Sequence, residues 1–261
     1  MLIQLNGQQL ETLTLDAPEG APRGLAPIVF LHEGLGSAAL WKDFPQQVCA
    51  ATGRAGVVYS RRGYGQSSPL SDVRGAGRRT PQFMHDEAWQ VLPALLHALG
   101  IEQPVLLGHS DGGSIALLHA ARHTVQACIV MAPHLYVEQL SVDSIAQAKV
   151  AYETTGLRDR LARYHRDVDS AFWGWNDIWL AREFRDWTIE DEVAQVRCPL
   201  LAIQGENDEY GTMRQIDRIA DLAPQARLLK LAACGHSPQR DQPQAVIDAV
   251  AAFLAAQAIS R

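Results

Sequence analysis

Three residues far apart in the chain have the side chains needed for nucleophilic catalysis: Ser110, Asp208 and His236. A serine hydroxyl is a weak nucleophile until a base takes its proton, and the base needs an acidic partner that fixes its tautomer. We interpret Ser110 as the nucleophile, His236 as the base and Asp208 as the group that orients the histidine. This order along the chain is the one expected when the serine lies on a strand-to-helix turn.

The surroundings of the serine predict such a turn. Gly108-His109-Ser110-Asp111-Gly112 fits G-x-S-x-G, with an apolar run at 104–107 before it and a helix-forming run at 113–121 after it. A side chain at either glycine would collide with the strand or the helix. The N-terminus of the helix directs N–H groups at the serine, where they stabilise negative charge.

Catalysis by a serine also needs hydrogen-bond donors for the oxyanion. We expect them to be the backbone N–H groups of Asp111 and of Gly34, which lies in the loop after a predicted strand at 27–31. Gly34 and Gly36 also resemble a dinucleotide-binding turn, but the next strand ends at Ser60 without the acidic residue that would hold a ribose. The cysteine spacing fits no zinc motif. We therefore predict neither a cofactor nor a metal.

The elements that must position these residues alternate between strands and helices. Asn6-Gly7 joins two alternating segments and predicts a hairpin at 2–15. Buried strands are predicted at 27–31, 56–59, 104–107, 127–131, 200–204 and 227–231. This order indicates an α/β fold with a mostly parallel twisted sheet and helices on both faces. Ligands bind beyond the carboxyl ends of such strands, where all three candidate catalytic residues fall.

The alternation stops at residue 134 and resumes near residue 199. The segment 134–191 is helical in character and holds four of the six tryptophans, so we interpret it as a helical cap inserted into a single domain that spans 1–261. Phe172, Trp175 and Trp179 share one helical face. We expect them mainly to pack between the cap and the domain, and some to line a pocket. The candidate substrate-binding residues are Trp175, Trp179, Tyr210 and Met213.

Composition narrows the classes of partner. The net charge is −6 and no long basic run exists, which argues against nucleic acid. We see no signal peptide and no apolar run near the roughly 20 residues of a membrane span. The four cysteines are scattered, as in a reduced protein. We expect a cytoplasmic protein that acts on a small molecule without nucleic acid or membrane, either as a monomer or as a homodimer.

These motifs together make the chain similar to the α/β-hydrolase fold family. The matching stretches are His32-x-Gly34-x-Gly36, Arg62-Gly63-Tyr64-Gly65-Gln66-Ser67, 108–113, Gly205-Glu206-Asn207-Asp208 and Gly235-His236. The resemblance implies a cofactor-free hydrolase with a cap over its pocket. Two positions depart from the family: Glu33 replaces the usual glycine, and Ser60 replaces a frequent aspartate. We expect Glu33 to point away and fix its loop by hydrogen bonds; the alternative is a catalytic acid.

A serine at the turn favours acyl transfer to water over the reactions of relatives that use aspartate there. The leading hypothesis is a serine hydrolase that cleaves a small carboxylic ester, lactone or thioester. The alternative enzyme is a hydrolase that cleaves a C–C bond in a vinylogous diketone. Comparing the rates of hydrolysis of p-nitrophenyl esters and of vinylogous dienones distinguishes the two. A non-catalytic small-molecule receptor is the alternative of another class. Labelling of Ser110 by a fluorophosphonate would exclude it.

Overall fold

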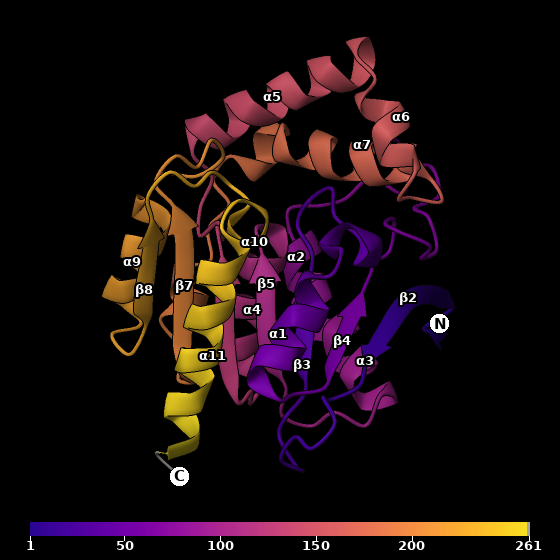
Figure 1. The fold of residues 1–261 in the computed structure, drawn as a ribbon. Helices are drawn as coiled ribbons and strands as arrows, with labels where there is room; N and C mark the ends of the chain where they lie inside the picture. Colours follow the sequence, from indigo (N-terminus) through magenta and orange to yellow (C-terminus); the bar gives the residue numbers. More distant parts are fainter. Residues whose placement is uncertain (260–261) are drawn as a thin grey trace.

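The computed structural model describes residues 1–259, which form one eight-stranded sheet in the order β1-β2-β4-β3-β5-β6-β7-β8 (Figure 1). β1 (Leu2–Leu5) and β2 (Gln8–Leu15) run antiparallel and join the sheet through β4. The other neighbours pair in parallel: β3 (Ile28–Leu31), β4 (Gly56–Tyr59), β5 (Val105–His109), β6 (Ala127–Met131), β7 (Leu200–Gly205) and β8 (Arg227–Leu231). The mostly parallel sheet predicted from the sequence is therefore confirmed.

The predicted hairpin is also present. Its turn residues, Asn6 and Gly7, have φ values of 48° and 79°. Two successive positive φ angles are what a two-residue hairpin turn requires, and asparagine and glycine adopt them at least cost.

Strand side chains alternate between two apolar layers. In β3, Val29 and Leu31 belong to one core cluster, and Ile28 and Phe30 belong to the cluster on the other face. The second cluster is covered by α1 (Phe44–Thr52) and α11 (Pro243–Ile259). The first cluster is covered by α2 (Phe83–Asp86), a π-helical turn (Glu87–Val91), α3 (Leu92–Ala98), α4 (Asp111–Arg122) and α9 (Arg214–Leu222). Burial on both faces explains why these strands read as continuous apolar runs.

Helices from the middle of the chain lie above the carboxyl ends of the parallel strands (Figure 1). They are α5 (Gln139–Thr154), α6 (Leu157–Ala162), α7 (Val168–Trp179) and a 3-10 turn (Arg182–Phe184), and α8 (Glu190–Val193) follows them. The two ends of this excursion meet, because Tyr136 bridges to Thr188 and the Ile189 N–H donates to the Leu135 carbonyl at 2.8 Å. The chain thus leaves and re-enters the α/β body at one place.

Basic residues of the 70–83 loop hold it against these helices. Arg74 pairs with Asp177 of α7 at 2.8 Å, and Arg78 pairs with Glu183 at 3.1 Å. Both arginines therefore contact acidic partners, although the side chains of Arg74 and Arg78 stay largely exposed. Within residues 1–259, no helix is both long and apolar enough to cross a membrane.

Candidate active site

Ser110 occupies a strained turn between β5 and α4. Its φ of 54° and ψ of −122° lie where residues other than glycine are uncommon. A Cβ on Gly108 would lie 2.2 Å from the Gly112 carbonyl oxygen, and one on Gly112 would lie 2.1 Å from the Leu31 carbonyl oxygen. Both glycines are therefore required by close backbone approach, which confirms the reason given for them from the sequence.

The structure brings the three candidate catalytic side chains together. Ser110 Oγ lies 2.9 Å from His236 Nε2, and His236 Nδ1 lies 2.8 Å from Asp208 Oδ1. Ser110 follows β5, Asp208 follows β7, and His236 follows β8, so each comes from a loop at the same edge of the sheet. A carboxylate only accepts hydrogen bonds, so Nδ1 carries the proton and Nε2 is free to accept the serine proton.

Asp208 is surrounded by donors. Besides His236, its Oδ1 accepts from the N–H groups of Tyr210 at 2.8 Å and Gly211 at 3.1 Å, and its Oδ2 accepts from Gln204 Nε2 at 3.2 Å. Burial would raise the pKa of this carboxyl, but hydrogen bonds from His236 and Tyr210 outweigh it and lower the pKa. The aspartate is thus held ionised beside the histidine.

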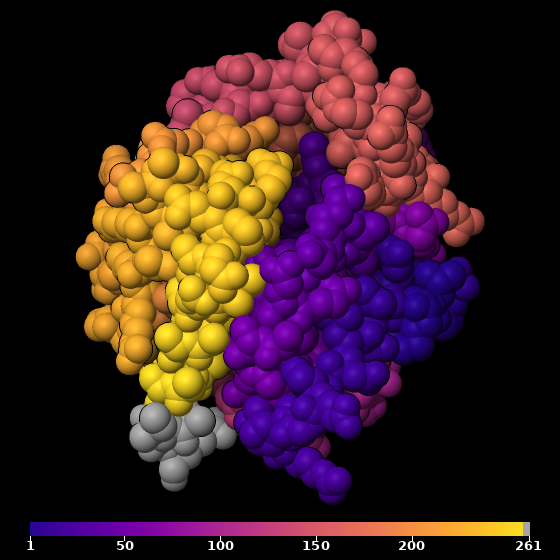
Figure 2. Space-filling view, in the orientation of Figure 1, coloured from indigo at the N-terminus to yellow at the C-terminus, as the bar shows by residue number. Residues whose placement is uncertain are grey.

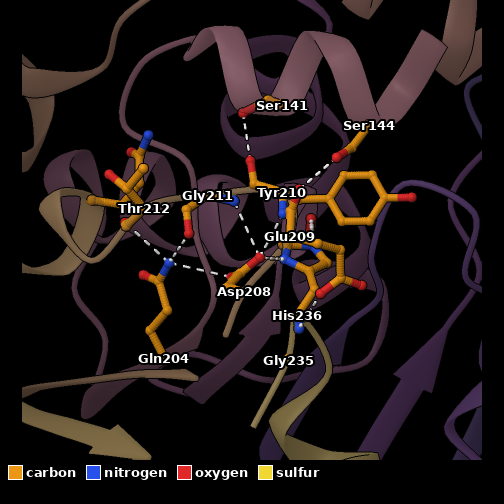
Figure 3. A network of polar contacts seen from close by, with 12 residues as sticks. Ser141, Ser144, Gln204, Asp208, Glu209, Tyr210, Gly211, Thr212, Gly235 and His236 are labelled. Carbon is orange, nitrogen blue, oxygen red and sulfur yellow. Dashed lines mark hydrogen bonds and ion pairs between the residues drawn. The ribbon is translucent and has the colours of Figure 1, made fainter. Parts of the chain in front are cut away.

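Helix α5 anchors the loop that carries Asp208 (Figure 3). Ser141 Oγ donates to the Tyr210 carbonyl and Ser144 Oγ donates to the Glu209 carbonyl, each at 2.5 Å. Glu209 in turn accepts from the His236 N–H at 3.1 Å. Helix α5 therefore contacts the loop that carries Asp208 directly, and this loop in turn contacts the loop that carries His236.

A second histidine supports the first one. His109 Nε2 donates to the His236 carbonyl at 2.7 Å, and Gln239 Nε2 lies 3.0 Å from His109 Nδ1. The sequence interpretation assigned His109 no role. Its position directly before Ser110 could have identified it from the sequence, because a residue there must lie beside the same crevice.

Hydrogen bonds fix the orientation of the Glu33–Gly34 peptide in the loop after β3. The Glu33 carbonyl accepts from Arg61 Nη2 at 2.9 Å and from His32 Nδ1 at 2.7 Å. In a trans peptide the N–H points opposite to the carbonyl, so the N–H of Gly34 points away from Arg61. Gly34 lines the same cavity as Ser110 and Asp111. Both residues predicted to supply oxyanion donors therefore line the cavity that contains Ser110.

Glu33 itself stays beside the site. It lines the cavity, and its Oε2 lies 3.4 Å from His109 Nδ1, so the side chain does not point away as expected. Burial would raise the pKa of Glu33, but the hydrogen bond and charge of His109 outweigh burial and lower the pKa to about 2. A carboxyl with this pKa is ionised at neutral pH and is poorly suited to act as a general acid.

The second departure from the family is compensated by a neighbouring strand. Ser60 Oγ accepts from the Ala38 N–H at 2.8 Å and donates to Glu11 Oε2 at 2.6 Å. The same Glu11 oxygen accepts from the Gln66 N–H at 2.9 Å. Glu11 of β2 thus provides the carboxylate that an aspartate at position 60 would have provided.

A group of buried ionisable residues lies behind the serine turn, and we call it the charged cluster: Tyr59, Arg61, Glu87 and Asp111. Arg61 Nη2 lies 3.7 Å from Asp111 Oδ2, and Tyr59 donates to Glu87 at 2.9 Å. Burial raises the pKa of both Glu87 and Asp111. The indole of Trp179 donates to Asp111 Oδ1 at 3.2 Å, which ties α7 to the start of α4.

The cavity in front of Ser110 has a volume of about 250 Å³. Of the predicted substrate-binding residues, Trp175, Trp179 and Tyr210 line it. Met213 does not line it: this residue directly precedes α9 and packs against the hydrophobic core. Sequence reasoning missed several further lining residues, which are His134, Leu35, Ile145, Glu209 and Arg240.

A second hollow, of about 350 Å³, shares Glu33, Ser237 and Arg240 with the first. Figure 2 shows the surface hollowed between the yellow C-terminal part, the violet N-terminal part and the pink helices above them. Among residues 1–259, no three histidine, cysteine, aspartate or glutamate side chains converge as metal ligands would.

Comparisons with known proteins agree with this geometry. The sequence profile described as the alpha/beta hydrolase family matches residues 28–249. The chain is 26% identical over 263 residues to the sn-1-specific diacylglycerol lipase ABHD11 of Mus musculus, which covers 88% of this chain and 81% of the lipase. It is 26% identical over 255 residues to a proline iminopeptidase of Lactobacillus delbrueckii subsp. bulgaricus, over 82% and 84% of the two chains.

Among solved structures, the enol-lactonase from Burkholderia xenovorans LB400 superposes with a TM-score of 0.74 at 20% identity, over 98% of this chain and 100% of that one. The protein therefore belongs to the alpha/beta hydrolase family and is a hydrolytic enzyme. These relatives are named for different substrates, so the family establishes the type of reaction and leaves the substrate to be argued from the site.

Proposed function

We propose that the protein hydrolyses a small carboxylic ester, lactone or thioester through an acyl-enzyme formed on Ser110. The observation that carries this proposal is the continuous chain of hydrogen bonds from Ser110 through His236 to Asp208, with lengths of 2.9 and 2.8 Å. A cavity of about 250 Å³ fits a small substrate, since pockets for drug-sized molecules begin near 300 Å³.

The reaction follows from these positions. Ser110 Oγ attacks the carbonyl carbon while His236 Nε2 takes its proton, and the ionised Asp208 stabilises the resulting imidazolium. The N–H groups of Gly34 and Asp111 stabilise the oxyanion, and each such donor is worth about 2.7–4 kcal/mol in the transition state. His236 then protonates the leaving oxygen or sulfur as its bond to carbon breaks. Water, deprotonated by His236, releases the acid from Ser110.

In this proposal the segment 134–191 acts as a cap. The support is that α5–α7 lie above the strand ends, that α7 supplies Trp175 and Trp179 to the cavity wall, and that α5 holds the loop of Asp208 through two serine hydroxyls. The substrate contacts proposed from these helices and from the acid loop are Trp175, Trp179 and Tyr210. The four cysteines are free, which fits a reducing compartment, so we propose a cytoplasmic location.

Labelling and mutation test the proposal together. A fluorophosphonate should modify Ser110 in the native protein and fail to modify Ser110→Ala, because only an activated hydroxyl reacts. On a panel of p-nitrophenyl esters, Ser110→Ala should lose turnover by about a millionfold. An unlabelled native protein, an undiminished Ser110→Ala variant, or cleavage of vinylogous dienones in place of esters would overturn the proposal.

A further inference from the structure

One polar side chain in the cavity wall has no assigned task. His134 is 3% exposed and lies between Trp179 and His236, with ring centroids at 4.9 and 5.8 Å. No hydrogen bond from residues 1–259 reaches its ring, and its Nδ1 is fully buried without a partner. Because Nδ1 is sealed within the protein, Nε2 is the ring nitrogen through which His134 can hydrogen-bond a partner in the cavity that it lines.

The state of this histidine restricts the partner's chemistry. Burial and the nearby charge of His236 lower the pKa of His134 to about 3, so the ring is neutral at working pH. A neutral imidazole has one N–H donor and one acceptor nitrogen. A charged group here, of either sign, would lose its hydration against Ile145 and Trp179. A neutral hydroxyl can donate to Nε2 or accept from it, so it suits this nitrogen in either tautomer.

The cavity has a closed end and an open end. Ile145, Trp179 and His134 are at most 3% exposed, whereas the side chains of Glu33 and Arg240, where the second hollow adjoins, are 30% and 75% exposed. In an acyl-enzyme reaction the leaving group departs and water enters while the acyl group stays bound to the serine. The buried end, where His134 lies, therefore suits the acyl group, and the exposed end suits the leaving group.

We propose that His134 hydrogen-bonds a hydroxyl group on the acyl part of the substrate, so that the enzyme acts on esters of short hydroxy acids. This inference rests on the acyl-enzyme proposed above. In it His134 is a specificity-determining residue: it contributes hydrogen bonds to one class of substrate and takes no part in proton transfer. A site built to bind a hydroxyl rejects the analogue that lacks it, because the histidine is then left unpaired.

The test compares p-nitrophenyl esters of butanoic, 2-hydroxybutanoic and 3-hydroxybutanoic acids. The native enzyme should favour one of the two hydroxy esters over the butanoate by about tenfold or more in kcat/KM. His134→Phe should reduce this ratio to about one, whatever its effect on the rate with the butanoate. His134→Gln, which keeps a donor and an acceptor, should retain much of the preference.

A ratio between substrates separates this role from a structural one, since a damaged fold lowers all three rates together. Ile145→Val provides the matched control, because it changes the same wall without changing its polarity and should alter the three esters alike. The inference is overturned if the native enzyme shows no preference for either hydroxy ester, or if His134→Phe keeps the preference. If Ser110→Ala remains active, the underlying acyl-enzyme proposal fails instead.

Discussion

The two sides of the serine turn use polar groups in opposite ways. In front of it, Asp208 accepts four hydrogen bonds, and His236 is held through both ring nitrogens. Behind it, in the charged cluster, Arg61 Nε and Nη1 and Asp111 Oδ2 have no hydrogen-bond partner within residues 1–259. Asp208 and His236 are thus fully paired, whereas the charges behind the turn are only partly compensated.

This difference indicates different tasks. Complete hydrogen bonding fixes the side chains that we propose to react, and it adds little that the fold itself needs. The charged cluster instead joins parts of the fold: Arg61 reaches the Glu33 carbonyl and Asp111, and Asp111 reaches Trp179 of α7. Changes in front should therefore alter rate, and changes behind should alter stability.

The largest expected effect is on rate. Asp208→Asn should lower kcat by up to about 10⁴-fold, because a neutral amide no longer stabilises the positive charge that forms on His236. Its carbonyl oxygen still accepts from the N–H groups of Tyr210 and Gly211, so the midpoint of urea unfolding should change little. Ester hydrolysis and urea titration of one preparation measure both quantities. If Asp208→Asn kept the native kcat or lost much of its unfolding free energy, the proposed distinction between the regions in front of and behind the serine turn would be wrong.

The next effect is on stability. Arg61→Met leaves Asp111 and Glu87 buried without their cation, and breaking a buried pair in this way costs about 3–5 kcal/mol of unfolding free energy. The double variant Arg61→Met with Asp111→Asn should recover part of this loss, since the new amide can still accept from Trp179. Denaturant unfolding of both proteins measures the effect. An unchanged midpoint for Arg61→Met would show that the cluster does not support the fold.

The smallest of these effects is on acid stability, and it arises away from both regions. Burial lowers the pKa of His119 to about 4, so between roughly pH 6.5 and 4 the unfolded chain binds a proton that the folded chain does not. Stability should fall as the pH drops, by on the order of 2 kcal/mol from pH 7 to 5 for this residue. His119→Gln should lose that part of the pH dependence, and replacement of the exposed His97 by glutamine is the control. Equal slopes for native protein and His119→Gln would contradict the assignment.

Most of the fold could be predicted because its signals are local. Apolar runs buried on both faces, the Asn6-Gly7 turn and the glycines at 108 and 112 each act through neighbouring backbone. The π-helical turn at Glu87–Val91 was not predicted. It precedes Pro93, whose missing N–H and bulky ring cannot join a regular α-helical ladder.

The candidate site was predictable where a motif names the residue and its fold position together, as for Ser110, Asp208 and His236. Contacts between distant segments were not. His134 reads as one more residue after a strand, and only the fold places it against Trp179. The prediction that Met213 binds substrate was wrong for the same reason. Its proximity to Asp208 in the sequence did not determine the direction of the chain at the start of α9.

The indole of Trp175 lies against the loop after β3, since a Cβ on Gly34 would come within 2.2 Å of its Nε1. Trp179 lines the same cavity. Two of the six tryptophans therefore border the space that a substrate fills. Occupancy changes the surroundings of both rings and therefore their ultraviolet emission. The protein thus carries its own optical reporter, and unreacted esters can be titrated into an inactive serine variant without any attached dye.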